Sequence, residues 1–444
     1  MFKNVLVKNF LTFKELNFNL MKNKSSINKF IAIYGENGSG KTSIVKAFDF
    51  LQKITSARVI DTKFLMGLPS ELWKEISEIR HGTKLSINIS DYRMIDEKEP
   101  TELKYDFDLN GIYGTYYIKF TDEIIDEELK LLNDKKISKV FEIKNENSEI
   151  KTLISSNFFF DKNYNLQLND EIKKLWGKYS FLSLLALEID DKNEEFIYKN
   201  ISDKLINTIN YFLSLDIYTE ENVGLNDVNM VKKQKKRGLL EINAVRGKKL
   251  PIKLKDVLLK YERSLTVLFT NAYADVKKVK YDIIINDDTI DYTLYFYKVI
   301  GNKVRRIPAL LESEGTRKIL KLFNQIKSTL FGDTVIIDEI DNGIHDLLME
   351  KIIMSLIDEI TGQLIITTHN TNLIEDLNKN SIYILISEFG GNKKINSISN
   401  YKFKTQKNNN IRKLYLQGVF GGIPICNGIE FDEIKQIFNE KKEN

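Results

Sequence analysis

The chain has 444 residues, enough for two or three domain-sized units, and 42% of them are hydrophobic. Its 66 basic and 62 acidic residues leave a formal net charge of +4, so overall charge gives no indication of a nucleic-acid partner. One cysteine and three histidines exclude internal disulfides and speak against a structural zinc site. Without a signal peptide or a membrane-length apolar run, we expect a soluble, cytoplasmic protein with no membrane contact.

The first half of the chain begins with strand patterns. The first twenty residues alternate between apolar and polar and predict paired strands. Phe30–Tyr34 is a short, β-rich apolar run followed at once by glycine-rich sequence, and a helical period begins at Thr42. Asn110 and Gly111 lie between two alternating runs and predict a hairpin turn.

The second half alternates between helices and strands. The segments in order are a helix at 315–331, a strand at Thr334–Ile337, a helix at Leu347–Ile360 and a strand at Leu364–Thr368. Together with the earlier strand and helix, this alternation predicts an α/β fold with a largely parallel sheet, joined by an antiparallel β subdomain.

The middle of the chain differs in character. It is charged, favours helices and shows no sustained heptad repeat. We therefore divide the chain into an N-terminal part of the core at 1–120, a mostly helical insertion at 121–275 and a C-terminal part of the core at 276–444.

A phosphate-binding loop is predicted at Gly35–Thr42, which reads GENGSGKT and matches G-x4-G-K-[ST] in full. Glycines let backbone N–H groups turn toward phosphates, and the following helix adds its positive end. A glycine-rich turn could match by chance, but the strand before it and the helix after it favour the functional interpretation. The predicted ATP-binding residues are Gly35, Asn37, Gly38, Ser39, Gly40, Lys41, Thr42 and Ser43, with Thr42 also a ligand of Mg²⁺.

Two carboxylates follow the apolar strand Thr334–Ile337. We expect this strand to lie beside the Phe30–Tyr34 strand, which would bring Asp338 to the magnesium ion and Glu339 to the attacking water as general base. An ordinary buried strand with a solvated acidic turn would look the same in isolation. The combination with the phosphate-binding loop favours an ATPase.

Two more segments are candidates for the catalytic site. His369 ends the strand Leu364–Thr368. Its position resembles that of the switch histidine of ABC-type ATPases, which implies contact with the γ-phosphate, although a histidine at a strand end is more often structural. Ser313 and Gly315 open the helix before the carboxylate strand, a place that resembles that of the ABC signature. This resemblance implies that they receive the γ-phosphate of ATP bound to a second subunit. As an alternative, Ser313 is only a helix N-cap.

The order of these motifs, with ESEGT at 312–316, DEIDNG at 338–343 and TTHN at 367–370, resembles the OLD-like branch of P-loop NTPases of the ABC type. Within that branch the sequence is similar to ATPases of bacterial phage-defence systems: the abortive-infection AbiL type, AriA of PARIS and Septu-like systems. The segment Arg412–Pro424 resembles a C-terminal segment of the same group. The resemblance covers about 1–120 and 280–425, and implies an ABC-type ATPase head.

The sequence departs from related families in several places. Glu314 and Thr316 replace residues of the usual LSGGQ signature, and no glutamine stands where a Q-loop is expected, since Gln52 is too close to the loop. Only 75 residues follow His369, too few for the Toprim nuclease domain of OLD nucleases. We therefore expect no nuclease within this chain.

The resemblance implies an ATP-hydrolysing sensor or motor that pairs with a second copy of itself and acts with a separate effector, a nuclease or toxin. The main alternative is a RecF- or SMC-like ATPase of DNA repair or chromosomes. A transporter subunit and a non-hydrolysing scaffold are less favoured. Nucleic acid stays an open partner: the basic cluster Lys232–Arg237, with Arg246, Lys248 and Lys249, is either a solvated loop or a phosphate-backbone contact.

Overall fold

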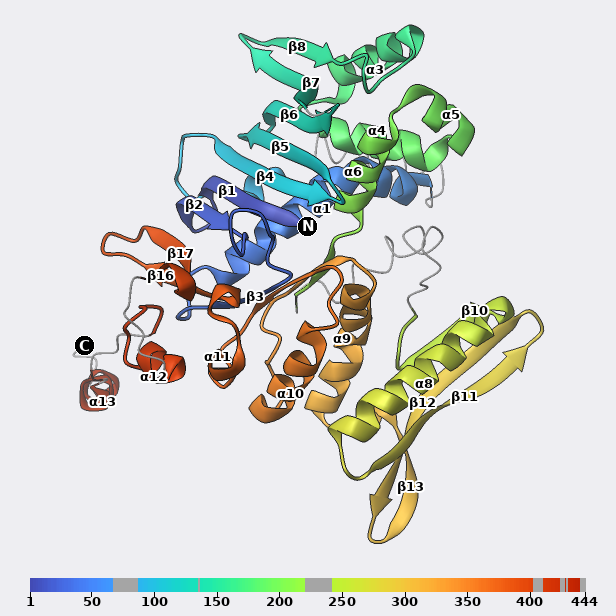
Figure 1. Ribbon diagram of the computed structural model, residues 1–444, viewed down its shortest axis with the longest axis vertical. Helices are drawn as coiled ribbons and strands as arrows, with labels where there is room; N and C mark the ends of the chain where they lie inside the picture. The colour runs from blue at the N-terminus through green and yellow to red at the C-terminus, as the bar shows by residue number, and fades with distance from the viewer. Residues whose placement is uncertain are drawn as a thin grey trace, which may run out of the picture.

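The computed structural model describes residues 1–66, 87–134, 136–219, 242–401, 410–423, 428 and 430–439. Its strands form three sheets, of which two lie in the body and one belongs to a projecting arm (Figure 1). None of the helices in these ranges is long and apolar enough to cross a membrane. The fold is α/β with parallel and antiparallel sheets, as the sequence predicts.

The central sheet has six strands and is parallel apart from one edge. In spatial order the strands are β17 (Lys393–Ser397), β16 (Ile382–Ser387), β3 (Phe30–Tyr34), β15 (Gln363–Thr367), β14 (Thr334–Ile337) and β9 (Asp216–Tyr218). The strands β3, β14 and β15 are buried along their whole length, which explains their continuous apolar runs. The expectation that β14 lies beside β3 is wrong, because β15 separates them. Strand order depends on how the connecting helices pack, which the strand sequences do not encode.

The second body sheet is antiparallel and has seven strands. They are β2 (Phe13–Asn19), β1 (Phe2–Phe10), β4 (Thr101–Leu109), β5 (Ile112–Phe120), β6 (Ile124–Asn133), β7 (Lys136–Glu146) and β8 (Glu149–Ile154). The predicted hairpin turn between β4 and β5 is confirmed, with positive φ at Asn110 and Gly111.

Strands β6 to β8 fall in the segment that the sequence analysis expects to be mostly helical, and for these residues that expectation is wrong. Their inward positions are apolar, such as Leu129 and Phe141, while the outward positions carry paired charges. The charges obscured the alternation. Helices occupy much of the remainder of that segment, and the three-part division of the chain stays a prediction.

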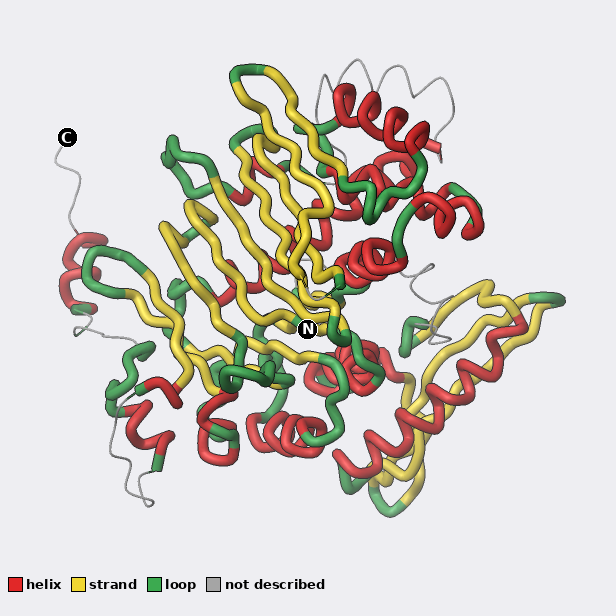
Figure 2. Tube along the Cα trace, turned by 45° about the horizontal axis from the view of Figure 1, so that its top comes forward, coloured by secondary structure: helices red, strands yellow, loops and turns green. Residues whose placement is uncertain are grey.

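Helices pack on both sides of the central sheet (Figures 1 and 2). On the side of the seven-stranded sheet lie α1 (Lys41–Met66), α3 (Lys162–Leu175), α4 (Phe181–Asp191), α5 (Glu194–Asn200) and α6 (Asp203–Leu213). The others are α9 (Glu314–Leu330), α10 (Asp346–Ile357), α11 (Leu373–Asp376), α12 (Ile411–Leu416) and α13 (Phe431–Asn439). Alternate residues of β3 enter two cores, Ile31 and Ile33 with α1, and Phe30 and Ala32 with α9 and α10.

An arm projects from the body just before α9 (Figure 1). It consists of β10 (Arg246–Pro251), α8 (Lys255–Ala272), β11 (Val276–Asn286), β12 (Thr289–Ile300) and β13 (Lys303–Pro308). The chain then makes a single 3-10 turn, Ala309–Leu311, and enters α9. The arm is therefore connected directly to the predicted signature segment.

Candidate functional site

The glycine-rich loop joins the end of β3 to the first turn of α1. Gly38 and Gly40 have φ values of +79° and +108°, which other residues adopt only under strain. A Cβ on Gly40 would also lie 2.9 Å from the Phe13 ring and from Thr12 Oγ1. The loop conformation and its packing against the β1–β2 turn thus both require glycine at this position.

Lys41 is the first residue of α1 and is buried. Its Nζ donates hydrogen bonds to the carbonyl oxygens of Gly35 at 2.9 Å and Glu36 at 3.1 Å. Burial lowers the pKa of Lys41, and the carboxylates of Glu339 and Asp338 oppose that shift. The strand-end carboxylates therefore face the lysine of the loop across the end of β15.

Thr367 links the carboxylate of Asp338 to the backbone of Glu339. Its Oγ1 donates to Asp338 Oδ1 at 2.5 Å and accepts the backbone N–H of Glu339 at 2.7 Å. Glu339 has a φ of +48°, a sparsely populated conformation for a residue with a side chain, which costs about 1–3 kcal/mol. Such strain is concentrated at functional sites, and here the threonine hydrogen bond holds it. Sequence analysis did not identify this role of Thr367.

His369 follows β15 at the same edge of the sheet. Its backbone N–H donates to Asp341, 3.1 Å from Oδ2, and this connects it to the loop after Glu339. Burial and the charge of Lys41 lower the pKa of His369, while Asp341 and Glu339 raise it. The imidazole therefore lies within electrostatic range of the phosphate-binding lysine and of the carboxylates that follow β14.

The polar groups around the loop fit a nucleotide with magnesium. Ser39 Oγ is buried and has no hydrogen-bond partner among the described residues, and Thr42 and Asn37 are exposed. Ser43 is buried, with its Oγ 3.1 Å from Thr12 Oγ1. No cluster of three or more metal-ligating side chains occurs in the described ranges. A magnesium ion held by one or two protein oxygens, water and phosphates needs no such cluster.

Lys393 is a further residue at the loop that the sequence does not reveal. It lies on β17, and its Nζ donates to the Gly38 carbonyl at 2.9 Å and lies 5.8 Å from the centroid of the Phe13 ring. Burial lowers the pKa of Lys393 and the carboxylate of Glu36 raises it. No local motif marks this lysine, because it reaches the loop only through the pairing of β17 with β16.

The C-terminal segment Arg412–Pro424 also reaches this region, in the part that the structure describes. A Cβ on Gly422 would lie 2.6 Å from Ile384 Cγ2 and 3.5 Å from Gly35 Cα. Tyr415 of α12 packs edge-on against Tyr34 at the end of β3, with 5.8 Å between ring centroids. The segment therefore supports the base of the glycine-rich loop.

The predicted signature segment forms the start of α9. Ser313 is the N-cap, and its Oγ accepts the Thr316 N–H at 3.3 Å. A Cβ on Gly315 would lie 2.8 Å from the Gly343 carbonyl oxygen, so this glycine packs on the loop that follows Glu339. Ser313 caps the helix and is exposed. Its exposure is compatible with the predicted contact to ATP bound by a second subunit, and that contact stays a prediction.

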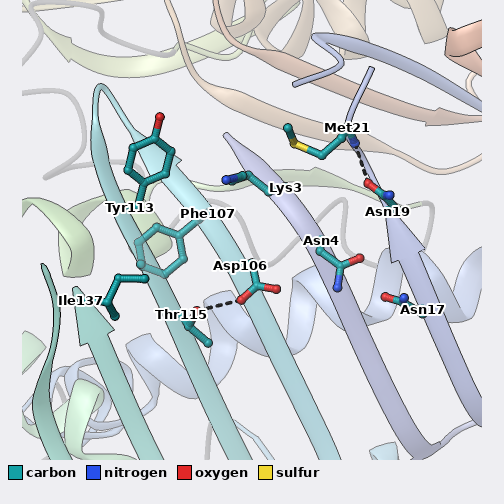
Figure 3. Close-up of a pocket in the computed structure, with 11 residues that line it drawn as sticks. Lys3, Asn4, Asn17, Asn19, Met21, Asp106, Phe107, Tyr113, Thr115 and Ile137 are labelled. Carbon is teal, nitrogen blue, oxygen red and sulfur yellow. Dashed lines mark hydrogen bonds between the residues drawn. The ribbon is translucent and has the colours of Figure 1, made fainter. Parts of the chain in front are cut away.

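Two other features lie apart from this site. The side-chain amide of Gln52 donates a hydrogen bond to the carbonyl oxygen of Leu215, the residue before β9. Gln52 therefore connects α1 to the start of β9. A pocket of about 420 Å³ lies on the outer face of the seven-stranded sheet (Figure 3). It includes Lys3, which stacks on Tyr113, and Asp106, which accepts from Thr115 at 2.7 Å. The pocket includes no residue of the glycine-rich loop.

A phosphate-binding loop after β3 and carboxylates after β14 in a largely parallel sheet define a P-loop ATPase fold of the ABC type. A family model described as "AAA domain, putative AbiEii toxin, Type IV TA system" matches residues 30–375. The chain belongs to this family. No curated protein matches it.

Three solved structures that resemble the chain are heads of SMC proteins. One, an SmcHead bound to the C-winged helix domain of ScpA, has 14% identity and a TM-score of 0.48, covering 89% of this chain and 97% of that chain. The SMC head domain from Thermotoga maritima has 12% identity and a TM-score of 0.37, with coverages of 89% and 98%. The Smc head domain with an extended coiled coil, bound to the C-terminal domain of ScpA and derived from Pyrococcus furiosus, has 15% sequence identity and a TM-score of 0.40. The match covers 89% of this chain and 95% of that chain.

Proposed function

We propose that this protein binds Mg-ATP at the loop Gly35–Thr42 and hydrolyses it. The observation that carries this proposal is the position of Lys41, Asp338 and Glu339 at one edge of the central sheet, where both carboxylates act electrostatically on the lysine. A positive charge at the start of a helix and oxygen ligands opposite it are what a metal-bound triphosphate requires.

The residues divide into binding and catalytic groups. Backbone N–H groups of the loop and of the first turn of α1 bind the phosphates, and Lys41 supplies the positive charge. Thr42 and Asp338 would hold magnesium through their side-chain oxygens, and the ion would supply positive charge against the phosphates. Glu339 accepts the proton of the attacking water, with its backbone fixed by Thr367. His369, which follows β15, would donate a hydrogen bond to the γ-phosphate.

The assignment of Glu339 as the base can be tested by substitution. Glu339→Gln should retain ATP binding while turnover falls by about a hundredfold or more, because the amide accepts no proton. Lys41→Ala should instead weaken nucleotide binding itself. Glu359→Gln, at an exposed position near the opposite end of β15, is the charge-matched control. ATP affinity by calorimetry and phosphate release are the measurements. A Glu339→Gln protein that hydrolyses ATP at the parental rate disproves the assignment.

The wider role that we propose is the ATPase subunit of a phage-defence system that acts with a separate effector. Its support is the family description, which names a putative AbiEii toxin and a Type IV TA system, and the resemblance of the sequence motifs to ATPases of phage-defence systems. A RecF- or SMC-like role in DNA repair is the alternative. Expression of the chain with and without its neighbouring genes under phage challenge distinguishes them, since a defence subunit protects cells only together with its effector.

A further inference from the structure

The sheet of the arm is covered on one face only, within the described residues. Helix α8 packs Leu258, Leu265 and Phe269 against one face of β11 and β12. The helix also closes the free edge of β11, because Thr266 and Glu262 accept the backbone N–H groups of Val279 and Tyr281. Figures 1 and 2 show α8 lying along this sheet. The edge is thus protected, and the opposite face is left open.

The open face carries rows of basic and aromatic side chains. Strand register places Lys278 opposite Tyr297 and Lys280 opposite Tyr295, with Arg306 on the next strand opposite Tyr297. Lys278 Nζ lies 4.7 Å from the centroid of the Tyr297 ring, and the Arg306 guanidinium lies 3.7 Å from that of Tyr295. We call these five residues the arm face.

The charge of the arm is unlike that of the whole chain. Residues 242–308 contain 14 lysines and arginines against 7 aspartates and glutamates, whereas the chain as a whole is almost balanced. On the arm face, Arg306 pairs with Asp282, and no carboxylate of the described residues forms an ion pair with Lys278 or Lys280. Several lysines on the outer face of the seven-stranded sheet are different, because each has a carboxylate within ion-pair distance. The pairs Lys119–Glu102, Lys139–Glu128 and Lys144–Asp126 join neighbouring strands, and Lys130–Glu128 lies within β6.

These four lysines are therefore compensated by carboxylates, whereas within the described residues Lys278 and Lys280 of the arm face are not. Uncompensated cations beside half-buried tyrosine rings are suited to a polyanion that also presents flat aromatic groups. Single-stranded nucleic acid is the polymer with both properties: phosphates contact lysine and arginine, and unpaired bases stack on tyrosine. A duplex keeps its bases stacked on one another and offers the tyrosines nothing.

We propose that the arm face binds single-stranded nucleic acid, with the backbone along Lys278 and Lys280 and bases on Tyr295 and Tyr297. Arg246, at the start of β10 and opposite Thr293 of β12, extends the basic surface. The predicted basic cluster Lys232–Arg237 lies outside the described residues and is not needed for this site. The proposal does not depend on ATP hydrolysis, so binding is tested without nucleotide.

The experiment measures fluorescence anisotropy of labelled thirty-nucleotide oligo(dT), oligo(U) and a DNA duplex with the full-length protein, at several salt concentrations. Lys278→Gln with Lys280→Gln should weaken single-strand binding about tenfold or more and make the log–log salt slope about 1.4 less steep, for two lost phosphate contacts. The matched control is Lys119→Gln with Lys144→Gln, which removes two ion-paired lysines from the seven-stranded sheet. It should change neither the affinity for single strands nor the salt slope.

The tyrosines separate stacking from charge. Tyr295→Leu with Tyr297→Leu should weaken binding about tenfold while leaving the salt slope unchanged, and the corresponding Phe double variant should bind like the parent. Binding of either single strand with these effects supports the proposal. It is overturned if neither strand binds, if the duplex binds as tightly as the single strands, or if the lysine variant binds like the control.

Discussion

At the scale of single residues, Lys393 is a determinant of the glycine-rich loop. Its hydrogen bond to the Gly38 carbonyl fixes a residue that has a positive φ and would otherwise sample several conformations. A loop held in one conformation loses less entropy when a ligand binds. Lys393 therefore acts as a positioning residue for the proposed nucleotide site.

Substitution of Lys393 should affect nucleotide affinity more than turnover at saturation. We expect Lys393→Met to weaken Mg-ATP and Mg-ADP binding about three- to tenfold, since one charge-assisted hydrogen bond is lost in a half-exposed position. Lys393→Arg should restore part of the affinity. Lys394→Met, on the next residue, which pairs with Glu388 at 2.6 Å, is the control. Calorimetry measures nucleotide affinity, and steady-state kinetics separate KM from kcat. Equal affinities of the two Met variants would contradict the positioning role of Lys393.

At the scale of elements, the start of α4 is built around a buried carboxyl group. Glu127 of β6 accepts hydrogen bonds from Trp176 Nε1 at 2.8 Å and from the Phe181 N–H at 2.7 Å, at the first turn of the helix. Tyr116 donates to the other oxygen at 3.0 Å. Burial raises the pKa of Glu127 to about 7 even though these hydrogen bonds lower it. The residue joins the seven-stranded sheet to α4.

The raised pKa of Glu127 predicts a pH dependence of stability. Between its ordinary value of 4.5 and about 7, the unfolded chain has released the proton while the folded protein retains it. Raising the pH through this range therefore lowers the free energy of unfolding by about 3 kcal/mol in total. Above pH 7 this group causes no further loss of stability. Glu127→Gln does not titrate and is the reference. Urea unfolding of both proteins at pH 5 and pH 7.5 measures the difference, and parallel pH profiles refute the prediction.

At the scale of the whole molecule, the proposed pairing of two copies depends on Ser313 and Gly315. The segment packs on the Gly343 loop of its own chain and exposes Ser313 at the start of α9. An ion pair at 2.6 Å joins the arm to this segment. It is formed by Lys298 of β12 and Glu312, the residue before Ser313. A phosphate from a second subunit would meet the free N–H groups at this helix end.

Ser313→Asp separates capping from phosphate binding. Aspartate is as good an N-cap as serine, so a cap alone predicts parental stability and parental ATPase activity. A carboxylate facing a phosphate should instead abolish ATP-dependent pairing and reduce turnover more than tenfold through charge repulsion. A mixture of Ser313→Asp with Lys41→Ala should recover part of the activity, because each heterodimer contains one intact composite site. Sedimentation measures ATP-dependent pairing, and phosphate release measures turnover. If the Ser313→Asp protein pairs and hydrolyses ATP like the parent, Ser313 is only a helix cap.

The sequence by itself determined the glycine-rich loop, the carboxylates after β14 and the histidine after β15, because each is a contiguous pattern whose strand and helix neighbours have clear periods. The tertiary structure alone decided that β15 separates β3 from β14, that Lys393 contacts a loop 355 residues away in the chain, and that cations and tyrosines gather on the arm face. These depend on strand order and register, which are set when distant apolar faces pack together. A local pattern of residue types fixes which face of a strand is buried, but not which strand becomes its neighbour.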